Sequence, residues 1–191
     1  MKRIYEKNRS VELRLLYTGK RIAAEVGRLA HEISSDYAGR ELLLVVVLKG
    51  AFIFAADLAR RIRLPLTVDF VKLASYNGME STGKVVITKD IETAAAGKHV
   101  LVVEDIVDTG LSLAFLLESL RSRGPKSLKV CTLIDKRERR RVDVSADYVG
   151  IVCDRGFLVG YGLDLDESRR ELPAIYEVVN SPSGGLNDSP M

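Results

Sequence analysis

Residues 100–112, with the sequence VLVVEDIVDTGLS, constrain the fold of this chain more than any other segment. Four apolar residues lead into Glu104 and Asp105, and a third acid, Asp108, follows three positions later. The apolar run is typical of a strand that is buried on both faces of a parallel sheet. The next apolar residues share one face of a helix: Leu113, Leu116, Leu117 and Leu120. We therefore expect a tight turn between strand and helix, which is where open α/β sheets bind ligands.

The residues of this turn suit a phosphorylated sugar. Backbone N–H groups of Thr109, Gly110, Leu111 and Ser112 can surround a phosphate at the start of a helix, and glycine permits close approach. Carboxylates at 104 and 105 would repel that phosphate, but they suit neutral sugar hydroxyls or a metal ion. The alternative interpretation is that these acids are solvated or cap the helix.

Strand and helix patterns alternate along the rest of the chain. Further strands are predicted at residues 13–17, 42–48, 67–73, 85–89, 127–135 and 148–153. Thr18 is a candidate cap for a helix whose apolar stripe is Ile22, Val26, Leu29, Ala30 and Ile33. A second helix is predicted at residues 51–62, facing inward with Phe52, Ala55, Ala59 and Ile62. This alternation indicates an α/β fold with a mostly parallel sheet flanked by helices.

Composition excludes several classes of protein. A net charge of +3 gives no reason to expect a nucleic-acid partner. The longest apolar run, residues 42–48, is far shorter than a membrane span, and the basic amino terminus lacks the apolar core of a signal peptide. Two cysteines in apolar runs indicate no disulfide framework, so we expect a cytoplasmic protein. The basic residues 139–141 are interpreted as a solvated loop or an oligomer contact.

Five motifs together resemble the type I phosphoribosyltransferases. The segment Glu104–Ser112 is similar to the family's motif for phosphoribosyl pyrophosphate (PRPP), in the form found in the 6-oxopurine branch, the hypoxanthine-guanine enzymes. The other four follow in the family's order: residues 48–50, residues 75–83, Lys136 with Arg137, and residues 157–164. The resemblance covers roughly residues 12–180.

The resemblance implies one domain at residues 1–180 with the type I phosphoribosyltransferase fold. Its core would span about residues 20–153, and a small hood would combine residues 154–180 with the N-terminal strand. A mobile lid hairpin is expected at residues 75–84. The turn-rich residues 181–191 are predicted to be a disordered tail. Relatives form dimers or tetramers, so we expect a homodimer or homotetramer.

The resemblance also implies transfer of a 5-phosphoribosyl group from PRPP to hypoxanthine or guanine, giving IMP or GMP and pyrophosphate. Asp108 matches the proposed general base at N7 of the purine. Lys136 matches the lysine that donates to O6, and Phe157 matches the aromatic residue that stacks on the base. Backbone groups near Leu158 and Asp164 would contact the remaining ring edge.

The remaining site residues implied by the resemblance concern pyrophosphate and metal. Pyrophosphate would meet Lys49, Gly50, Ser75, Tyr76 and Arg170, although the adjacent Arg169 makes this last assignment sensitive to register. The implied cofactor is Mg²⁺, because PRPP carries a pyrophosphate. Its ligands would come from Asp164, Glu104 and Asp105.

Two other functions remain open at this point. One is a PRPP-sensing regulator that binds RNA, like the pyrimidine attenuation proteins of the same fold. Those regulators usually lack an acid where Asp108 stands and carry a broad basic face. The other is a transferase for uracil, orotate or adenine, against which Lys136 and Phe157 argue.

Overall fold

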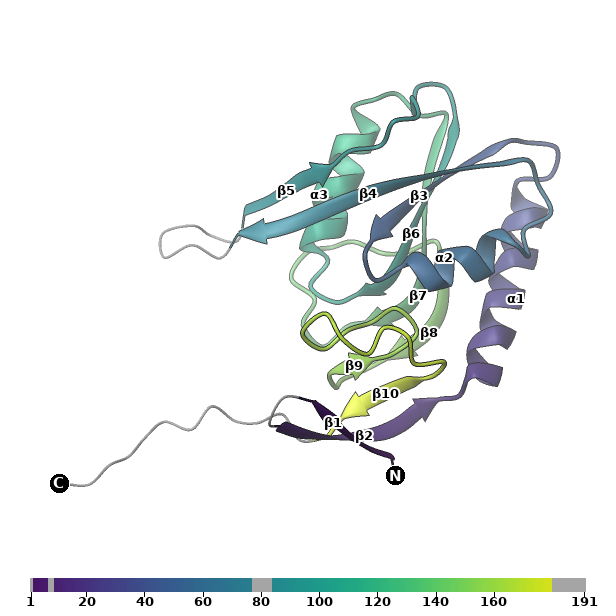
Figure 1. Ribbon diagram of the computed structural model, residues 1–191. Helices are drawn as coiled ribbons and strands as arrows, with labels where there is room; N and C mark the ends of the chain where they lie inside the picture. The colour runs from purple at the N-terminus through teal and green to yellow at the C-terminus, as the bar shows by residue number, and fades with distance from the viewer. Residues whose placement is uncertain (1, 7–8, 77–83, 180–191) are drawn as a thin grey trace.

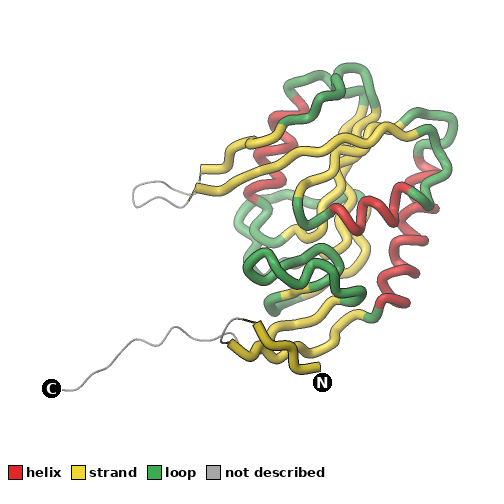
Figure 2. The backbone as a smooth tube through the Cα atoms, viewed as in Figure 1, coloured by secondary structure: helices red, strands yellow, loops and turns green. Residues whose placement is uncertain are grey.

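The computed structural model describes residues 2–6, 9–76 and 84–179, which form two sheets and three helices (Figures 1 and 2). Residues 77–83 of the expected lid and the expected tail at 181–191 lie outside the described residues. No helix in the described part is long and apolar enough to cross a membrane.

The central sheet has six strands in the order β5-β4-β3-β6-β7-β8. Their bounds are β3 (Leu42–Leu48), β4 (Leu66–Tyr76), β5 (Lys84–Lys89), β6 (His99–Val107), β7 (Ser127–Lys136) and β8 (Tyr148–Cys153). All neighbours pair in parallel except β5, which runs antiparallel to β4. Val45 of β3 lies opposite Val102 of β6, and both are fully buried. The predicted α/β class and its mostly parallel sheet are confirmed.

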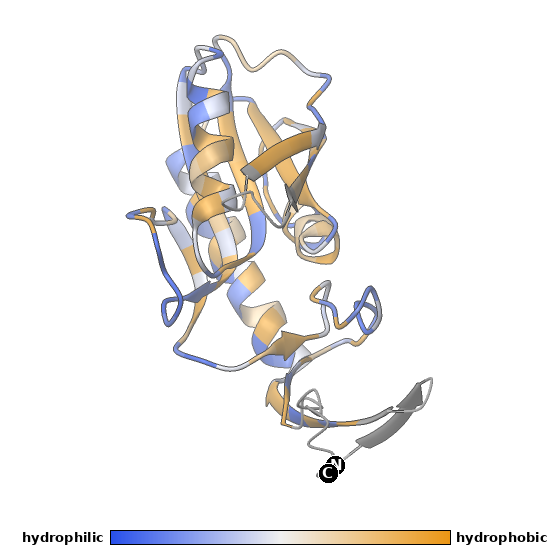
Figure 3. Cartoon of the chain, turned by 90° about the vertical axis from the view of Figure 1, so that its left-hand side faces the viewer, coloured by the Kyte–Doolittle hydropathy of each residue, from blue (hydrophilic) through white to orange (hydrophobic). Residues whose placement is uncertain are grey.

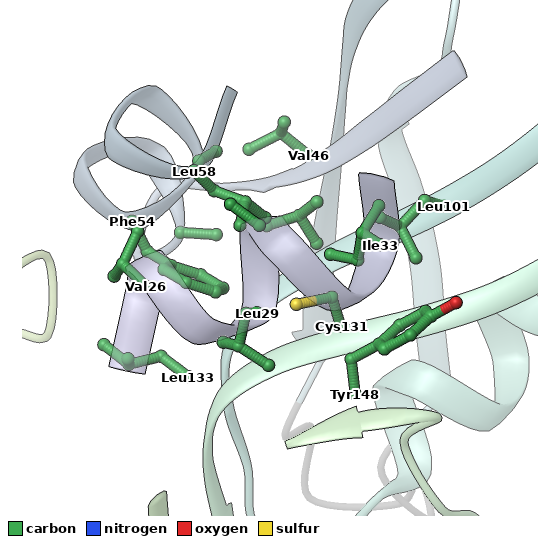
Figure 4. Packing of buried hydrophobic residues seen from close by; sticks show 14 of the residues in the cluster. Val26, Leu29, Ile33, Val46, Phe54, Leu58, Leu101, Cys131, Leu133 and Tyr148 are labelled. Carbon is green, nitrogen blue, oxygen red and sulfur yellow. The ribbon is translucent and has the colours of Figure 1, made fainter. Parts of the chain in front are cut away.

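Helices cover both faces of this sheet, which explains why its middle strands are apolar throughout (Figure 1). Helix α1 (Gly19–Asp36) and helix α2 (Phe52–Ala59) pack on one face, and helix α3 (Leu111–Arg121) packs on the other. Thr18 caps α1 as predicted, since its Oγ1 accepts from Arg21 N at 3.2 Å. Figure 4 shows Leu29 and Ile33 of α1 packed with Phe54 of α2 near Cys131 of the sheet.

The predicted inward face of the second helix is confirmed at Ala55 and Ile62, which are buried, and is wrong at Phe52. Helix α2 is shorter than residues 51–62, and its buried residues are Phe54, Ala55 and Leu58. Phe52 is 44% exposed. The sequence FIFAADLA is apolar on nearly all sides, so helical spacing alone does not fix which side faces the core.

A second, smaller sheet has the order β1-β2-β10-β9. Its strands are β1 (Lys2–Glu6), β2 (Arg9–Tyr17), β9 (Leu158–Val159) and β10 (Ile175–Val178), so both ends of the chain contribute. This sheet lies beside the carboxyl ends of the central strands, and the loop between β9 and β10 fills the space between the two sheets (Figure 1). In Figure 3 the central strands are mostly hydrophobic, whereas this loop has hydrophilic stretches.

A candidate active site at the carboxyl edge of the sheet

In the turn between β6 and α3, the N-cap residue offers no side chain to the first backbone N–H groups of the helix. Gly110 occupies the N-cap position with a φ of 81° and has no side chain that could cap the helix, and Thr109 Oγ1 accepts from Leu111 N at 3.5 Å. Asp108 does not cap this helix, because its Oδ1 has no hydrogen-bond partner among the described residues and its Oδ2 faces Lys136 and Arg139. A Cβ atom on Gly110 would lie 2.6 Å from Val144 Cγ1, so only glycine fits. Uncapped amides at a helix start favour an anion.

Two adjoining cavities lie at this edge of the sheet. The first has a volume of about 300 Å³ and is lined by the turn itself, including Glu104 and residues 108–110. The second has a volume of about 500 Å³, and its lining includes Lys136, Phe157, Leu158 and Asp164. Both cavities are lined by Asp105, Ile106 and Asp108. The three acids predicted to act together thus border one continuous hollow.

Glu104 and Asp105 form a buried acidic pair, each only 9% exposed. Burial, followed by the neighbouring Asp105 carboxyl, raises the pKa of Glu104 well above its usual range. Burial also raises the pKa of Asp105, although a hydrogen bond with Glu104 and the charge of Arg170 act in the opposite direction. Without a ligand, the pair therefore favours holding a proton. The expectation that both side chains are ionised carboxylates is corrected accordingly.

Gly50 is placed against this acidic pair. A Cβ atom on Gly50 would overlap the Asp105 carboxylate, and one on Gly162 would overlap the Gly50 carbonyl oxygen. Gly162 itself has a φ of 102°. The loop after β3 also contains a cis peptide between Leu48 and Lys49. Sequence reasoning named Gly50 but missed Gly162, whose only signal is its place in the Gly-Tyr-Gly stretch at 160–162.

At the other end of the hollow, Asp108 faces two cations. Its Oδ2 lies 3.8 Å from Lys136 Nζ and 3.5 Å from Arg139 Nη1. Its Oδ1 is buried without a hydrogen-bond partner among the described residues. Lys136 is itself buried, at 6% exposure. A buried acceptor without a partner beside a buried ammonium suits a ligand that offers one donor and one acceptor.

Phe157 and Leu158 occupy different environments. Phe157 is 49% exposed although it lines the larger cavity, so it is not a core residue. Leu158 is buried in β9, where it pairs with Glu177 of β10. Only the aromatic side chain is free to stack on a planar ligand.

Arg170 connects the loop between β9 and β10 to the turn after β3. Its Nη2 lies 2.9 Å from Asp164 Oδ1 and 3.3 Å from Glu167 Oε2, and Lys49 Nζ lies 2.8 Å from the same Glu167 oxygen. Arg170 Nε is buried and has no partner within the described chain. Two cations thus converge on one exposed carboxylate, Glu167.

The remaining predicted residues lie at the end of β4. Ser75 and Tyr76 are its last two residues, but their side chains are not described. In residues 2–6, 9–76 and 84–179, no group of three His, Cys, Asp or Glu side chains is poised to hold a metal. The structure therefore brings Asp105 and Asp164 to one cavity without a preformed metal cage.

One residue of the basic run was misinterpreted. Arg139 and Arg141 are exposed, as expected of a solvated loop, but the Arg140 side chain is only 20% exposed. It donates to the carbonyl oxygens of Val107, Asp108, Lys136 and Val144. The run of arginines in the sequence gives no indication of which one turns inward.

Comparisons with known proteins agree with this geometry. Residues 14–166 match the family model of the phosphoribosyl transferase domain. A hypoxanthine-guanine phosphoribosyltransferase of Aquifex aeolicus is 46% identical over 172 residues, which cover 89% of this chain and 97% of the relative. A crystal structure of a hypoxanthine-guanine phosphoribosyltransferase from Bacillus anthracis has a TM-score of 0.83 at 45% identity, covering 89% of this chain and 99% of that one. A hypoxanthine phosphoribosyltransferase structure from Staphylococcus aureus has a TM-score of 0.83 at 42% identity, covering 86% and 90%. The chain belongs to the phosphoribosyltransferase family.

Proposed function

We propose that this protein is a purine salvage enzyme that transfers the 5-phosphoribosyl group of PRPP to hypoxanthine or guanine. A bond forms between a ring nitrogen of the base and the anomeric carbon, while the bond from that carbon to the pyrophosphate oxygen breaks. The ring proton passes to Asp108, and the products are IMP or GMP and pyrophosphate.

The pairing of Asp108 with Lys136 is the observation that carries this proposal. The carboxylate has a buried oxygen without a partner in the described structure, and the ammonium lies 3.8 Å from its other oxygen. A 6-oxopurine offers a ring N–H to the acid and an exocyclic oxygen to the lysine. A 6-aminopurine would present a donor to an all-donor group, so adenine fits poorly. Phe157 lies at the same cavity, where it can stack on the ring.

The sugar end of the hollow supports PRPP as the other substrate. The amides of residues 109–112 at the start of α3 suit a 5′-phosphate, and Glu104 and Asp105 suit the ribose hydroxyls. A pair that holds one proton keeps one negative charge, which would also stabilise positive charge that develops on the anomeric carbon. Lys49 and Arg170, together with Ser75 and Tyr76, are the proposed pyrophosphate contacts.

The acids fit Mg²⁺ brought in by the substrate. Mg²⁺ usually binds through one or two carboxylates, substrate phosphate oxygens and water, so the absence of a three-acid cluster among the described residues is compatible with it. Asp164, Glu104 and Asp105 would hold the ion. When bound, the ion would neutralise charge on the departing pyrophosphate.

The proposed division of the chain follows the site. The core spans about residues 20–153, and the second sheet, with residues 154–180, acts as the hood. Residues 75–84 act as the lid that excludes water during transfer. We also propose a cytoplasmic homodimer or homotetramer. Val68 and Phe70 on β4 are 44% and 38% exposed, which suits a buried contact with a second copy.

A panel of bases tests the proposed function. Purified protein is mixed with PRPP and Mg²⁺, and nucleotide formation is followed spectrophotometrically with hypoxanthine, guanine, xanthine, adenine or uracil. We expect turnover with hypoxanthine or guanine and almost none with adenine or uracil. Turnover with uracil alone would assign another transferase reaction. PRPP binding without turnover of any base would favour the RNA-binding regulator.

A further inference from the structure

The Arg140 side chain joins its own loop and the end of β7 to the end of β6, which lies more than thirty residues earlier in the sequence. Its Nε donates to Asp108 O at 2.9 Å, and its Nη2 donates to Val107 O at 3.1 Å and to Lys136 O at 3.3 Å. Its Nη1 donates to Val144 O at 2.5 Å. One guanidinium thus binds the end of β6, the end of β7 and the loop that follows β7.

A buried carboxylate fixes the orientation of this guanidinium. Asp135, the penultimate residue of β7, has a side chain only 9% exposed and forms an ion pair with Arg140 Nη2. The other oxygen of Asp135 accepts from Arg137 Nε at 3.0 Å. The arginine stem also packs on the turn, since a Cβ atom on Gly110 would lie 3.2 Å from Arg140 Cδ. Arg140 is therefore held from two sides.

We propose that Arg140 is a positioning residue that sets the separation between Asp108 and Lys136, and through it the recognition of the base. The last strand pair between β6 and β7 is Val107 with Asp135, and Arg140 binds the carbonyl groups of the two residues that follow it, so the guanidinium adds a connection where the ladder ends. The proposal rests on the proposed function, because it concerns the roles of Asp108 and Lys136 in that reaction.

A lysine at position 140 would not replace this contact. Arginine carries five N–H donors in a planar fork, whereas lysine has three donors on a single nitrogen. The four carbonyl oxygens and one carboxylate around Arg140 require donors that point in different directions. We therefore expect R140K, which preserves the charge, to lose almost as much activity as R140A, which removes the side chain.

The experiment compares R140K and R140A with R141A in steady-state assays against hypoxanthine, adenine and PRPP. Arg141 is an exposed neighbour whose backbone N donates to Thr109 O at 3.0 Å, a bond that R141A preserves. Because small misplacements at a site can cost about 10²-fold, both Arg140 variants should lose about 10- to 10²-fold in kcat/KM for hypoxanthine. The KM for PRPP should change by less than about threefold, and preference for hypoxanthine over adenine should fall about tenfold. R141A should match the parent protein.

Two further measurements separate positioning from simple loss of folding. Methylguanidinium, but not methylammonium, should restore part of the hypoxanthine activity of R140A. D135N keeps the shape of the side chain but weakens the ion pair that anchors Arg140, so it should show a smaller loss of kcat/KM and of selectivity. If the Arg140 variants do not fold, D135N is the variant that tests the proposal.

Several results would overturn the inference. One is an R140A protein with the parent's selectivity for hypoxanthine over adenine. Another is a loss of kcat/KM that is equal for hypoxanthine and PRPP and that follows the unfolded fraction measured in a thermal melt. If D135N alone folds, unchanged kcat/KM and selectivity in it would also overturn the inference. If the parent protein is inactive with every base, the proposed function fails instead.

Discussion

The phosphate end and the base end of the hollow are built in different ways. Residues 104–112 supply the phosphate end from one strand, one turn and the start of one helix. The base end needs Asp108 from the turn after β6, Lys136 from β7, and Phe157 and Asp164 from segments beside the second sheet. Backbone geometry therefore determines the first end locally, whereas packing between sheets determines the second. Substitutions should affect the two ends separately.

Asp108→Asn should have the largest effect on activity. It tests whether a residue that borders both cavities acts on the base without affecting phosphate binding. Loss of a general base costs about 10²- to 10⁴-fold, so kcat with hypoxanthine should fall at least about 10²-fold. The KM for PRPP should remain within a few-fold, because the phosphate amides are unchanged. The matched control is Asp166→Asn, which removes an exposed carboxylate from the same cavity. Unchanged turnover in Asp108→Asn would remove the base role.

Lys136→Ala should affect only the base end. Hydrogen bonds to a charged group contribute about 1.5–3 kcal/mol, so selectivity for 6-oxo over 6-amino bases should fall about 10- to 10²-fold. Competition assays with hypoxanthine and adenine measure this ratio. Selectivity equal to that of the parent would place recognition of O6 on another residue.

Gly50→Ala should act mainly at the phosphate end. Its Cβ atom would overlap the Asp105 carboxylate, so the acid or the loop must move. We expect about a tenfold rise in the KM for PRPP and a loss of about 1–3 kcal/mol in the free energy of unfolding. Gly27→Ala is the control. Its added Cβ atom would lie 3.4 Å from Arg61 Nη1, which is close to an ordinary van der Waals distance. A Gly50→Ala protein with the parent's KM and stability would contradict the close approach.

Glu104→Gln should have the smallest effect, and it concerns stability. Burial raises the pKa of Glu104, so the folded state holds a proton that the unfolded state loses. This contribution to stability is complete below the unfolded pKa of about 4.5 and is lost as pH rises towards the folded value. The ligand-free variant should therefore melt about 2–4 °C above the parent at pH 8, and this difference should shrink at pH 4.5. A lower melting temperature at pH 8 would show that the buried pair is not destabilising.

The parts of this molecule that were predictable from the sequence depend on local patterns. Apolar runs identified β3 and β6, and the polar Thr18 before an apolar stripe identified the start of α1. The inward side of α2 was only partly identified, with Ala55 right and Phe52 wrong, because its sequence is apolar on nearly all sides. Gly162 and Arg140 were missed because each acts on backbone from a distant segment, which leaves no periodic signal in the sequence.

A crystal structure with PRPP and Mg²⁺ tests the central claim most directly. We predict that the 5′-phosphate lies within about 2.7–3.2 Å of the amides of residues 109–112, with the ribose hydroxyls near Glu104 and Asp105. The opposite edge of the sheet offers a competing anion site, a cavity of about 320 Å³ whose lining includes Arg40, Lys98 and Lys126. A PRPP phosphate found in that cavity, with the turn after β6 empty, would contradict the account.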